Sequence, residues 1–108
     1  MRLIYNKYEE EVEKLILTSG KDRLIENTLG LVGEAGEFAE KIKKCIRDTS
    51  DYNDQKEELL KELGDVLFYL TSLCNYFDSN LSIVMEMNIR KLHDRKKRNK
   101  LQGSGDNR

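Results

Sequence analysis

Two short stretches of the sequence repeat one pattern of acidic and small residues. Residues 34–38 read Glu-Ala-Gly-Glu-Phe, and residues 62–66 read Glu-Leu-Gly-Asp-Val. In each stretch the two acids are three positions apart, a spacing that makes them neighbours on a helix surface. Four converging carboxylates repel one another unless cations hold them, and hard oxygen ligands suit Mg²⁺, or Mn²⁺ in its place. The candidate metal ligands are therefore Glu34, Glu37, Glu62 and Asp65.

The apolar residues around both acidic pairs predict the helices that would position them. Helical spacing gives each segment an apolar stripe, centred on Ala35 in one and on Leu63 in the other. At about 100° per residue, the two acids of each pair lie at the same angles around the helix from the centre of the stripe, and on the same side of it. In an antiparallel pair of helices, the two sets of acids would share one side with an axial mismatch of only ~4–5 Å.

A solvated acidic face is the alternative to a metal site. The sequence holds 20 acidic residues, so pairs with this spacing also arise by chance, as in Glu10 and Glu13. One such pair alone is more typical of a solvated surface. Two pairs on neighbouring helices, each with a glycine inside it, are harder to explain by chance, and the spacing leaves both interpretations open.

Glycines accompany both pairs of acids. Each helical glycine costs ~1 kcal/mol relative to alanine. A glycine also lets another helix or a ligand approach the backbone closely. We therefore expect Gly33, Gly36 and Gly64 to clear space around the acids.

Four helices account for most of the sequence, which contains no proline and only 7% aromatic residues. We expect Ser19 and Gly20 to end the first helix and Asn80 to cap the last one. Short connections favour antiparallel neighbours, so the predicted architecture is an all-α four-helix bundle. The expected helices cover residues 3–18, 22–47, 55–77 and 81–99.

Length and composition bound the organisation of the chain. The 108 residues fit one domain, predicted over residues 1–102, with a short tail over 103–108. A net charge of −1 gives no general attraction for nucleic acid. We expect no membrane partner and no signal peptide, and therefore a cytoplasmic protein.

Cys45 and Cys74 lack a CxxC spacing and are expected to be free thiols. Four short amphipathic helices leave apolar surface uncovered, which favours a dimer or a larger assembly.

The fourth helix adds polar groups to an apolar stripe. Asn88 interrupts the stripe, and Lys91 and Arg95 follow it on one side of the helix. These cations could neutralise the acids or hold phosphate groups. The alternative is a solvated basic surface, because residues 90–100, which include His93, are basic throughout.

The segments LGLVGEAGEFAEKIKK, LLKELGDVLFYLTSL and NIRKLHDRKKR resemble the MazG-like all-α nucleoside triphosphate pyrophosphohydrolases. That family has the pattern E-x-x-E, a spacer, then E-x-x-D, which the four acids match with residues 38–61 as the spacer. The resemblance covers about residues 24–98. The closing GSGDNR looks like the ending of some small members.

The resemblance implies hydrolysis of a nucleoside triphosphate to the monophosphate and pyrophosphate with Mg²⁺. It implies that the four acids hold the metal, that Asn88 and Lys91 contact metal-bound phosphates, and that Arg95 is a weaker candidate for the same contact. It also implies a dimer or a tetramer. The base, the sugar and the choice between housecleaning and trimming of the nucleotide pool stay open. So do two other functions: hydrolysis of phosphoribosyl-ATP, and a helical oligomerisation module without activity.

Overall fold

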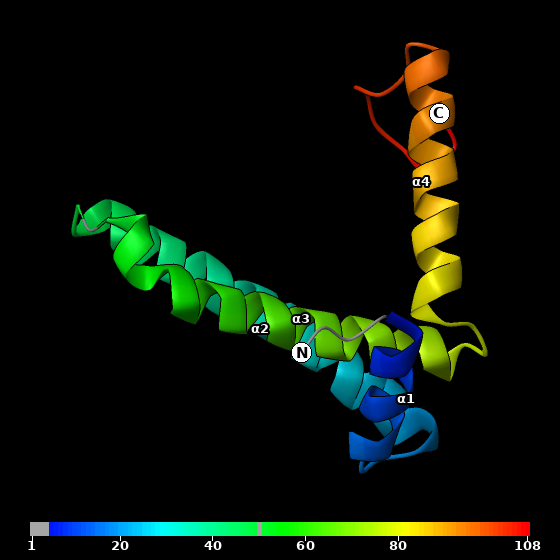
Figure 1. Ribbon diagram of the computed structural model, residues 1–108, viewed down its shortest axis with the longest axis horizontal. Helices are drawn as coiled ribbons and strands as arrows, with labels where there is room; N and C mark the ends of the chain where they lie inside the picture. The colour runs from blue at the N-terminus through cyan, green and yellow to red at the C-terminus, as the bar shows by residue number, and fades with distance from the viewer. Residues whose placement is uncertain (1–4, 50) are drawn as a thin grey trace.

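A computed structural model describes residues 5–49 and 51–108 of the chain (Figure 1). Within these residues all regular structure is helical and no strand is present, which confirms the all-α prediction. The four α-helices lie close to their predicted positions, although the first two predicted positions of the first helix fall outside the described residues. The elements are α1 (Tyr5–Leu15), α2 (Gly20–Arg47), the 3₁₀ helix η1 (Tyr52–Gln55), α3 (Lys56–Tyr76) and α4 (Leu81–Lys97).

The connection between α1 and α2 corrects one expectation. Helix α1 ends at Leu15, so Ser19 and Gly20 do not terminate it. Ser19 is instead the N-cap residue of α2, and its carbonyl accepts a hydrogen bond from the Arg23 amide at 3.2 Å. Gly20 has a φ of 57°, a left-handed conformation that glycine adopts at little cost. This glycine turns the chain into α2 rather than closing α1.

Helices α2 and α3 form a long antiparallel hairpin (Figure 1). Near its tip, the Asp51 carboxylate caps η1 by accepting a hydrogen bond from the Asn53 amide at 2.9 Å. At the other end of the hairpin, Gly30 lies directly against the ring of Tyr69. A Cβ atom built at Gly30 would stand 2.5 Å from a ring carbon of Tyr69. This glycine is therefore required for the close approach of the two helices.

We expect Gly30→Ala to destabilise the protein, although alanine is normally the better helix former. The overlap with Tyr69 is a case of overpacking, which typically costs about 1–3 kcal/mol. Gly33→Ala is the matched control, because its Cβ meets nothing within 4 Å. That substitution is expected to raise the free energy of unfolding by up to ~1 kcal/mol. Urea denaturation of both variants measures the difference, and a stabilised Gly30→Ala protein would contradict the packing argument.

The seam of the hairpin differs from the predicted stripes. Ala35 and Leu63, the expected stripe centres, are both exposed. On α2 the face toward α3 includes the buried Asn27 and Cys45, with Glu34 half-buried between them. Polar groups therefore take part in the contact between the helices, and apolar residues are turned outward. The large apolar residues of the hairpin left exposed are Ile25, Leu29, Val32, Ile46, Leu60, Leu63 and Leu67.

Helix α4 is attached firmly at its first turn. The Asn80 side chain accepts a hydrogen bond from the Ile83 amide at 2.9 Å, which confirms the predicted N-cap. The Glu9 carboxylate of α1 accepts from the amide of Ser82 at 2.7 Å and from its hydroxyl at 3.0 Å. Carboxylates are stabilised at this position by the unpaired amides of a helix N-terminus.

Beyond its first turn, α4 projects away from the hairpin (Figure 1). Within one chain, α4 contacts α1 and α3 at its base only, and most of its length lies outside the bundle formed by the other helices. The turn before it includes Asp78 in a left-handed conformation, with a φ of 56°. Four apolar residues of the projecting helix are exposed: Ile83, Met85, Met87 and Ile89.

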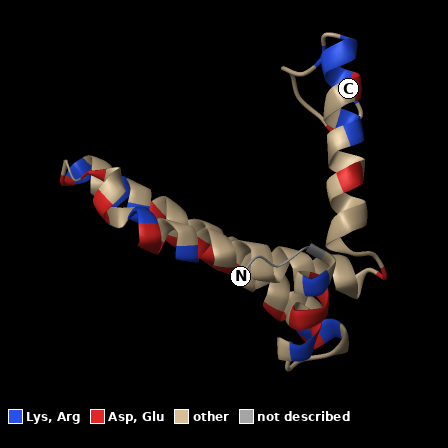
Figure 2. Ribbon diagram, viewed as in Figure 1, with Lys and Arg blue, Asp and Glu red and all other residues tan. Residues whose placement is uncertain are grey.

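The charged residues are distributed unevenly (Figure 2). Acidic and basic residues alternate along the α2–α3 hairpin, whereas the far end of α4 is mainly basic, as the sequence indicates. His93 is exposed there, as predicted.

Cys45 and Cys74 are free thiols, also as predicted. None of the helices over residues 5–49 and 51–108 combines the length and apolar character that a membrane crossing requires.

Candidate metal centre

Three of the four predicted ligands meet at the seam of the α2–α3 hairpin. Glu34 comes from α2, and Glu62 and Asp65 come from α3. Each contributes one carboxylate oxygen, and these oxygen atoms all lie within 4.8 Å of one another. Glu34 and Glu62 are half-buried between the helices, whereas Asp65 is exposed at the rim. The antiparallel pairing thus brings together acids that are far apart in the sequence.

Glu37 lies one helical turn beyond Glu34 and is exposed. It is not part of the group of three whose oxygen atoms approach one another. Its negative charge still reaches the site, because it is one of the causes that raise the pKa of Glu34. Within this chain the convergence therefore involves three carboxylates with the fourth beside them.

The neighbouring acids and the helix contact together raise the pKa of Glu34 above its ordinary value of 4.5. The first cause is a hydrogen bond with the Glu62 carboxyl group, followed by burial and by the negative charges of Asp65, Glu62 and Glu37. A hydrogen bond between two carboxyl groups requires a shared proton. In the metal-free protein, a proton on Glu34 therefore relieves part of the repulsion that a cation would relieve.

Glu62 supplies the observation that tests whether a metal fits. Its Oε2 atom is buried and accepts no hydrogen bond among the described residues when Glu34 is ionised; a proton on Glu34 is what lets the two carboxyl groups pair. Its Oε1 atom lies 3.2 Å from Lys41 Nζ. A buried carboxylate oxygen without a partner is costly. A divalent cation with oxygen ligands would satisfy it together with Glu34 and Asp65, so the donor set fits Mg²⁺ or Mn²⁺.

Lys41 is a residue of the site that the sequence patterns did not single out. Its Nζ atom lies 3.2 Å from Glu62 Oε1 and 3.8 Å from Glu58 Oε2. The hydrogen bond with Glu62 is the first cause that raises the pKa of Lys41. Its spacing in the sequence could have identified it, because Lys41 follows Glu34 by seven positions and therefore lies on the same face of α2.

We expect Lys41→Met to lower the melting temperature of the metal-free protein. The substitution removes the cation paired with Glu62, whose side chain is only 14% exposed. Lys43→Met is the control, because Lys43 is 69% exposed and is paired only loosely with Glu40, at 3.9 Å. Thermal unfolding in the presence of a chelator measures both. An equal change in the two variants would show that Lys41 contributes no more than an ordinary surface lysine.

One aromatic side chain lies close enough to the acids to feel their charge. The pKa of Tyr8, on α1, is raised first by burial and then by the negative charge of Asp65. Helix α1, which carries Tyr8, packs on α3, which carries Asp65. Of the other aromatic side chains, Phe77 is largely exposed, and Phe38, Tyr69 and Tyr76 are half-buried like Tyr8.

The predicted phosphate contacts all lie on α4, which projects away from the hairpin (Figure 1). Asn88 is exposed. Lys91 Nζ lies 3.0 Å from the carboxylate of Asp106, and Arg95 is only 4% exposed. Within one chain, the structure therefore does not bring Asn88, Lys91 or Arg95 to the carboxylate cluster.

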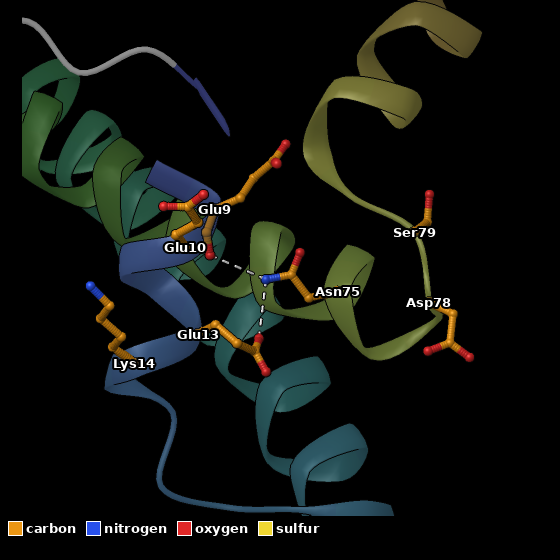
Figure 3. Close-up of a pocket in the computed structure, with 7 residues that line it drawn as sticks. All are labelled: Glu9, Glu10, Glu13, Lys14, Asn75, Asp78 and Ser79. Carbon is orange, nitrogen blue, oxygen red and sulfur yellow. Dashed lines mark hydrogen bonds between the residues drawn. The ribbon is translucent and has the colours of Figure 1, made fainter. Parts of the chain in front are cut away.

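A shallow hollow of about 710 Å³ lies elsewhere, between α1 and the turn after α3 (Figure 3). Its polar groups have structural partners. Glu13 binds the Arg23 guanidinium through both carboxylate oxygens, at 2.8 and 2.7 Å, and this contact lowers the pKa of Glu13. Asn75 donates to Glu13 at 3.1 Å and to the Glu9 carbonyl at 3.4 Å. These contacts join α1 to α2 and α3, and we assign the hollow no ligand.

The fold and the site together define an all-α protein with a carboxylate cluster on a helical hairpin. The family model described as the MazG nucleotide pyrophosphohydrolase domain matches residues 23–99, and the chain belongs to this family. The resemblance predicted from the sequence is thereby confirmed over nearly the same residues.

The chain is also similar to the Gene 37 protein of Mycobacterium phage L5. The two are 49% identical over 83 residues, which cover 75% of this chain and 73% of the phage protein. No solved structure matches the chain.

Proposed function

We propose that the chain is a Mg²⁺-dependent nucleoside triphosphate pyrophosphohydrolase. It would convert a ribo- or deoxyribonucleoside triphosphate and water to the monophosphate and pyrophosphate, in housecleaning or trimming of the nucleotide pool. The supporting observation is the cluster of Glu34, Glu62 and Asp65, with its unpartnered Glu62 oxygen, in a chain of the MazG family.

The carboxylates have two tasks in this proposal. Glu34, Glu62 and Asp65 would hold Mg²⁺, and a rotation of the exposed Glu37 side chain would add the fourth ligand. Bound metal supplies charge neutralisation for the phosphate oxygens as the phosphorus–oxygen bond breaks. One of the four carboxylates would take the proton of the attacking water.

The basic end of α4 would bind the phosphate groups. The Asn88 amide can donate hydrogen bonds to phosphate oxygens, and the Lys91 ammonium offers a positive charge to them. Because α4 projects away from the acids of its own chain, we propose that these groups act at the acids of a partner copy. The enzyme would then be a homodimer or a homotetramer.

We accordingly expect an obligate oligomer in solution. Apolar residues are exposed both on the α2–α3 hairpin and on α4. Val32 on the hairpin is 67% exposed, and Met87 on α4 is 64% exposed. Contiguous exposed apolar surface favours association with another protein surface. Analytical ultracentrifugation at micromolar concentration measures the mass. A folded monomer under those conditions would contradict the prediction and the shared site.

The reaction is tested by incubating the full chain with Mg²⁺ and a panel of ribo- and deoxyribonucleoside triphosphates that also includes phosphoribosyl-ATP. Chromatography identifies the products. Monophosphate and pyrophosphate support the proposal, whereas diphosphate and phosphate would overturn the assigned bond. Turnover of phosphoribosyl-ATP alone would move the activity to that substrate. Turnover of none would favour an oligomerisation module.

A further inference from the structure

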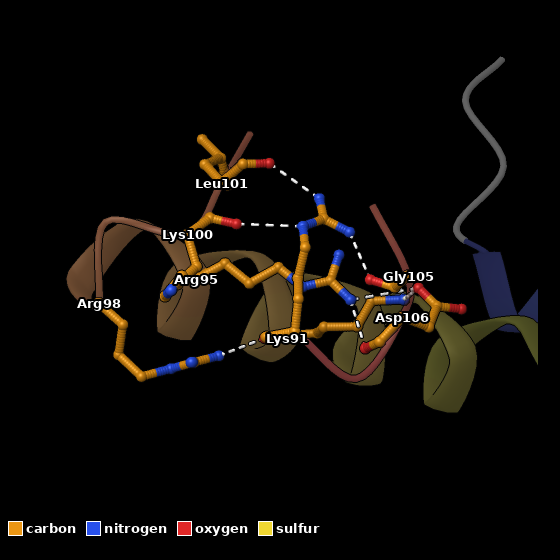
Figure 4. A network of polar contacts seen from close by, with 8 residues as sticks. Lys91, Arg95, Arg98, Lys100, Leu101, Gly105 and Asp106 are labelled. Carbon is orange, nitrogen blue, oxygen red and sulfur yellow. Dashed lines mark hydrogen bonds and ion pairs between the residues drawn. The ribbon is translucent and has the colours of Figure 1, made fainter. Parts of the chain in front are cut away.

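The last residues of the sequence form an ordered loop against α4. This closing loop, residues 98–108, folds back along the far end of the helix (Figures 1 and 4). Arg108 pins it by donating hydrogen bonds to three carbonyl groups, those of Lys100 at 3.1 Å, Leu101 at 2.8 Å and Gly105 at 2.6 Å. Arg98 in turn donates to the Arg108 carbonyl at 2.7 Å. The loop therefore has its own internal set of contacts.

Two glycines give the loop its shape. Gly103 has a φ of 139° and Gly105 a φ of 85°, both in the region that side chains disfavour. A Cβ atom at Gly103 would also approach the Arg108 side chain to 3.2 Å. The sequence Gly-Ser-Gly is thus matched to the turn that carries Asp106 back to α4.

The loop meets α4 through Asp106 (Figure 4). The Arg95 side chain, only 5% exposed, donates to the Asp106 carbonyl and lies 3.2 Å from its Oδ1 atom. Lys91 Nζ lies 3.0 Å from the same Oδ1 atom, and the Lys91 side chain is 38% exposed. One carboxylate oxygen thus joins a buried guanidinium to an accessible ammonium group.

We propose that Asp106 is a positioning residue for Lys91, with Arg95 as the anchor that holds the closing loop in place. This inference rests on the proposed function, in which Lys91 contacts phosphate groups. A lysine ammonium has three N–H donors. One of them is directed to Asp106, which leaves two for phosphate oxygens on the accessible side. Arg95 is too deeply buried in this arrangement to contact a phosphate itself.

The contacts favour a fixed support over a lid that a phosphate would displace. A lid held only by ion pairs could be released when phosphate replaced the Asp106 carboxylate. Here the Arg95 contact to the Asp106 carbonyl and the Arg108 contacts do not involve that carboxylate. They would hold the loop in place whether or not Lys91 binds an anion. The carboxylate itself is 80% exposed, so its removal should leave the fold intact.

A double-mutant cycle on the full chain tests the inference, with Asp106→Asn, Lys91→Ala and the two combined. The readouts are kcat and KM for a nucleoside triphosphate with Mg²⁺, and the melting temperature of each variant. If Asp106 acts through Lys91, Asp106→Asn lowers kcat/KM about tenfold, and it has no further effect once Lys91 is absent. The melting temperatures of Asp106→Asn and the parent should agree.

Two further variants make the test specific. Asp106→Glu keeps the charge and should restore part of the lost activity. Glu86→Gln is the matched control, because Glu86 also pairs with an arginine of α4, Arg90, but has no contact with the closing loop. Its kinetics should equal those of the parent.

The outcomes separate the inference from the proposed function. An unchanged or raised kcat/KM in Asp106→Asn would overturn the positioning role, and a raised value would identify Asp106 as a competitor of phosphate. A tenfold loss that persists in the Lys91→Ala background would also overturn it, because Asp106 would then act independently of Lys91. A parent chain that hydrolyses no nucleotide would instead remove the proposed function, and the role of Asp106 with it.

Discussion

Asp65→Asn is expected to abolish nucleotide hydrolysis and to raise the melting temperature of the metal-free protein. The loss should reach at least about a thousandfold in kcat, because a metal ligand contributes several kcal/mol to stabilisation of the transition state. The gain in stability has the opposite origin. Asparagine is nearly the same size as aspartate, but it removes one of three carboxylates whose oxygen atoms lie within 4.8 Å of one another.

The size of the stability gain follows from simple electrostatics. Two like charges ~4 Å apart repel by ~1 kcal/mol in water, and by more at a lower effective dielectric. A change of ~1 kcal/mol shifts the melting temperature of a domain of this size by about 4–8 °C. Glu62→Gln should lose the same activity but gain less stability, because it also removes the partner of Lys41.

Glu57→Gln is the control for both measurements. Glu57 lies on the first turn of α3 and is 86% exposed, and its contact with Lys61 is long, at 3.9 Å. Both its activity and its metal-free melting temperature should match those of the parent. If Asp65→Asn behaved like Glu57→Gln, the three carboxylates would be a solvated face, and the proposed metal centre would fail.

The elements of the fold could be predicted from the sequence because they depend on local signals. Apolar spacing located the four helices, and an asparagine before an apolar run identified the cap of α4 at Asn80. Three of the four predicted acids, Glu34, Glu62 and Asp65, also came together, because the antiparallel hairpin follows from a short connection between two long helices, whereas Glu37 stays outside the group. In contrast, Ser19 and Gly20 were assigned to the wrong helix, since glycine and serine occur at both helix ends.

The packing of the helices could not be predicted in the same way. Apolar periodicity made Ala35 and Leu63 the expected centres of the seam, but both are exposed. The hairpin instead buries Asn27 and places Glu34 between the helices. Periodicity cannot distinguish a residue that faces its neighbour in the same chain from one that would face another copy. The direction of α4 could not be predicted because apolar spacing locates a helix and does not orient it.

Contacts between polar residues that are distant in the sequence could not be predicted either. Lys41 and Asp106 reach their partners only in the folded chain. Because 36% of the residues are charged, the sequence does not distinguish these two from ordinary surface charges. Arg95 is a candidate for phosphate binding in the sequence because it follows Asn88 on the same side of the helix as Lys91. Its burial by the closing loop became visible only in three dimensions.

The effects of Mg²⁺ and of pH on stability are expected to be linked through Glu34. Its folded pKa lies above 4.5, so the folded protein holds this proton more tightly than the unfolded chain does. The stability that the proton contributes is complete below pH 4.5 and is lost as the pH rises through the folded pKa. In the metal-free protein, the free energy of unfolding should therefore fall over this range relative to that of Glu34→Gln, which has no proton to lose.

Mg²⁺ should reverse this difference near neutral pH. A ligand that binds only the folded state stabilises it by about 2.7 kcal/mol at a concentration of 100 Kd. The parent should gain this stability on addition of Mg²⁺, whereas Glu34→Gln and Asp65→Asn should gain much less. Urea denaturation from pH 4.5 to 7.5, with Mg²⁺ and with a chelator, measures the free energy of unfolding of the parent and of each variant. Comparing each variant with the parent cancels the pH dependence of other groups, such as Glu13 and Asp106, whose pKa values are lowered. Equal stabilisation of the parent and both variants by Mg²⁺ would place the metal elsewhere on the protein.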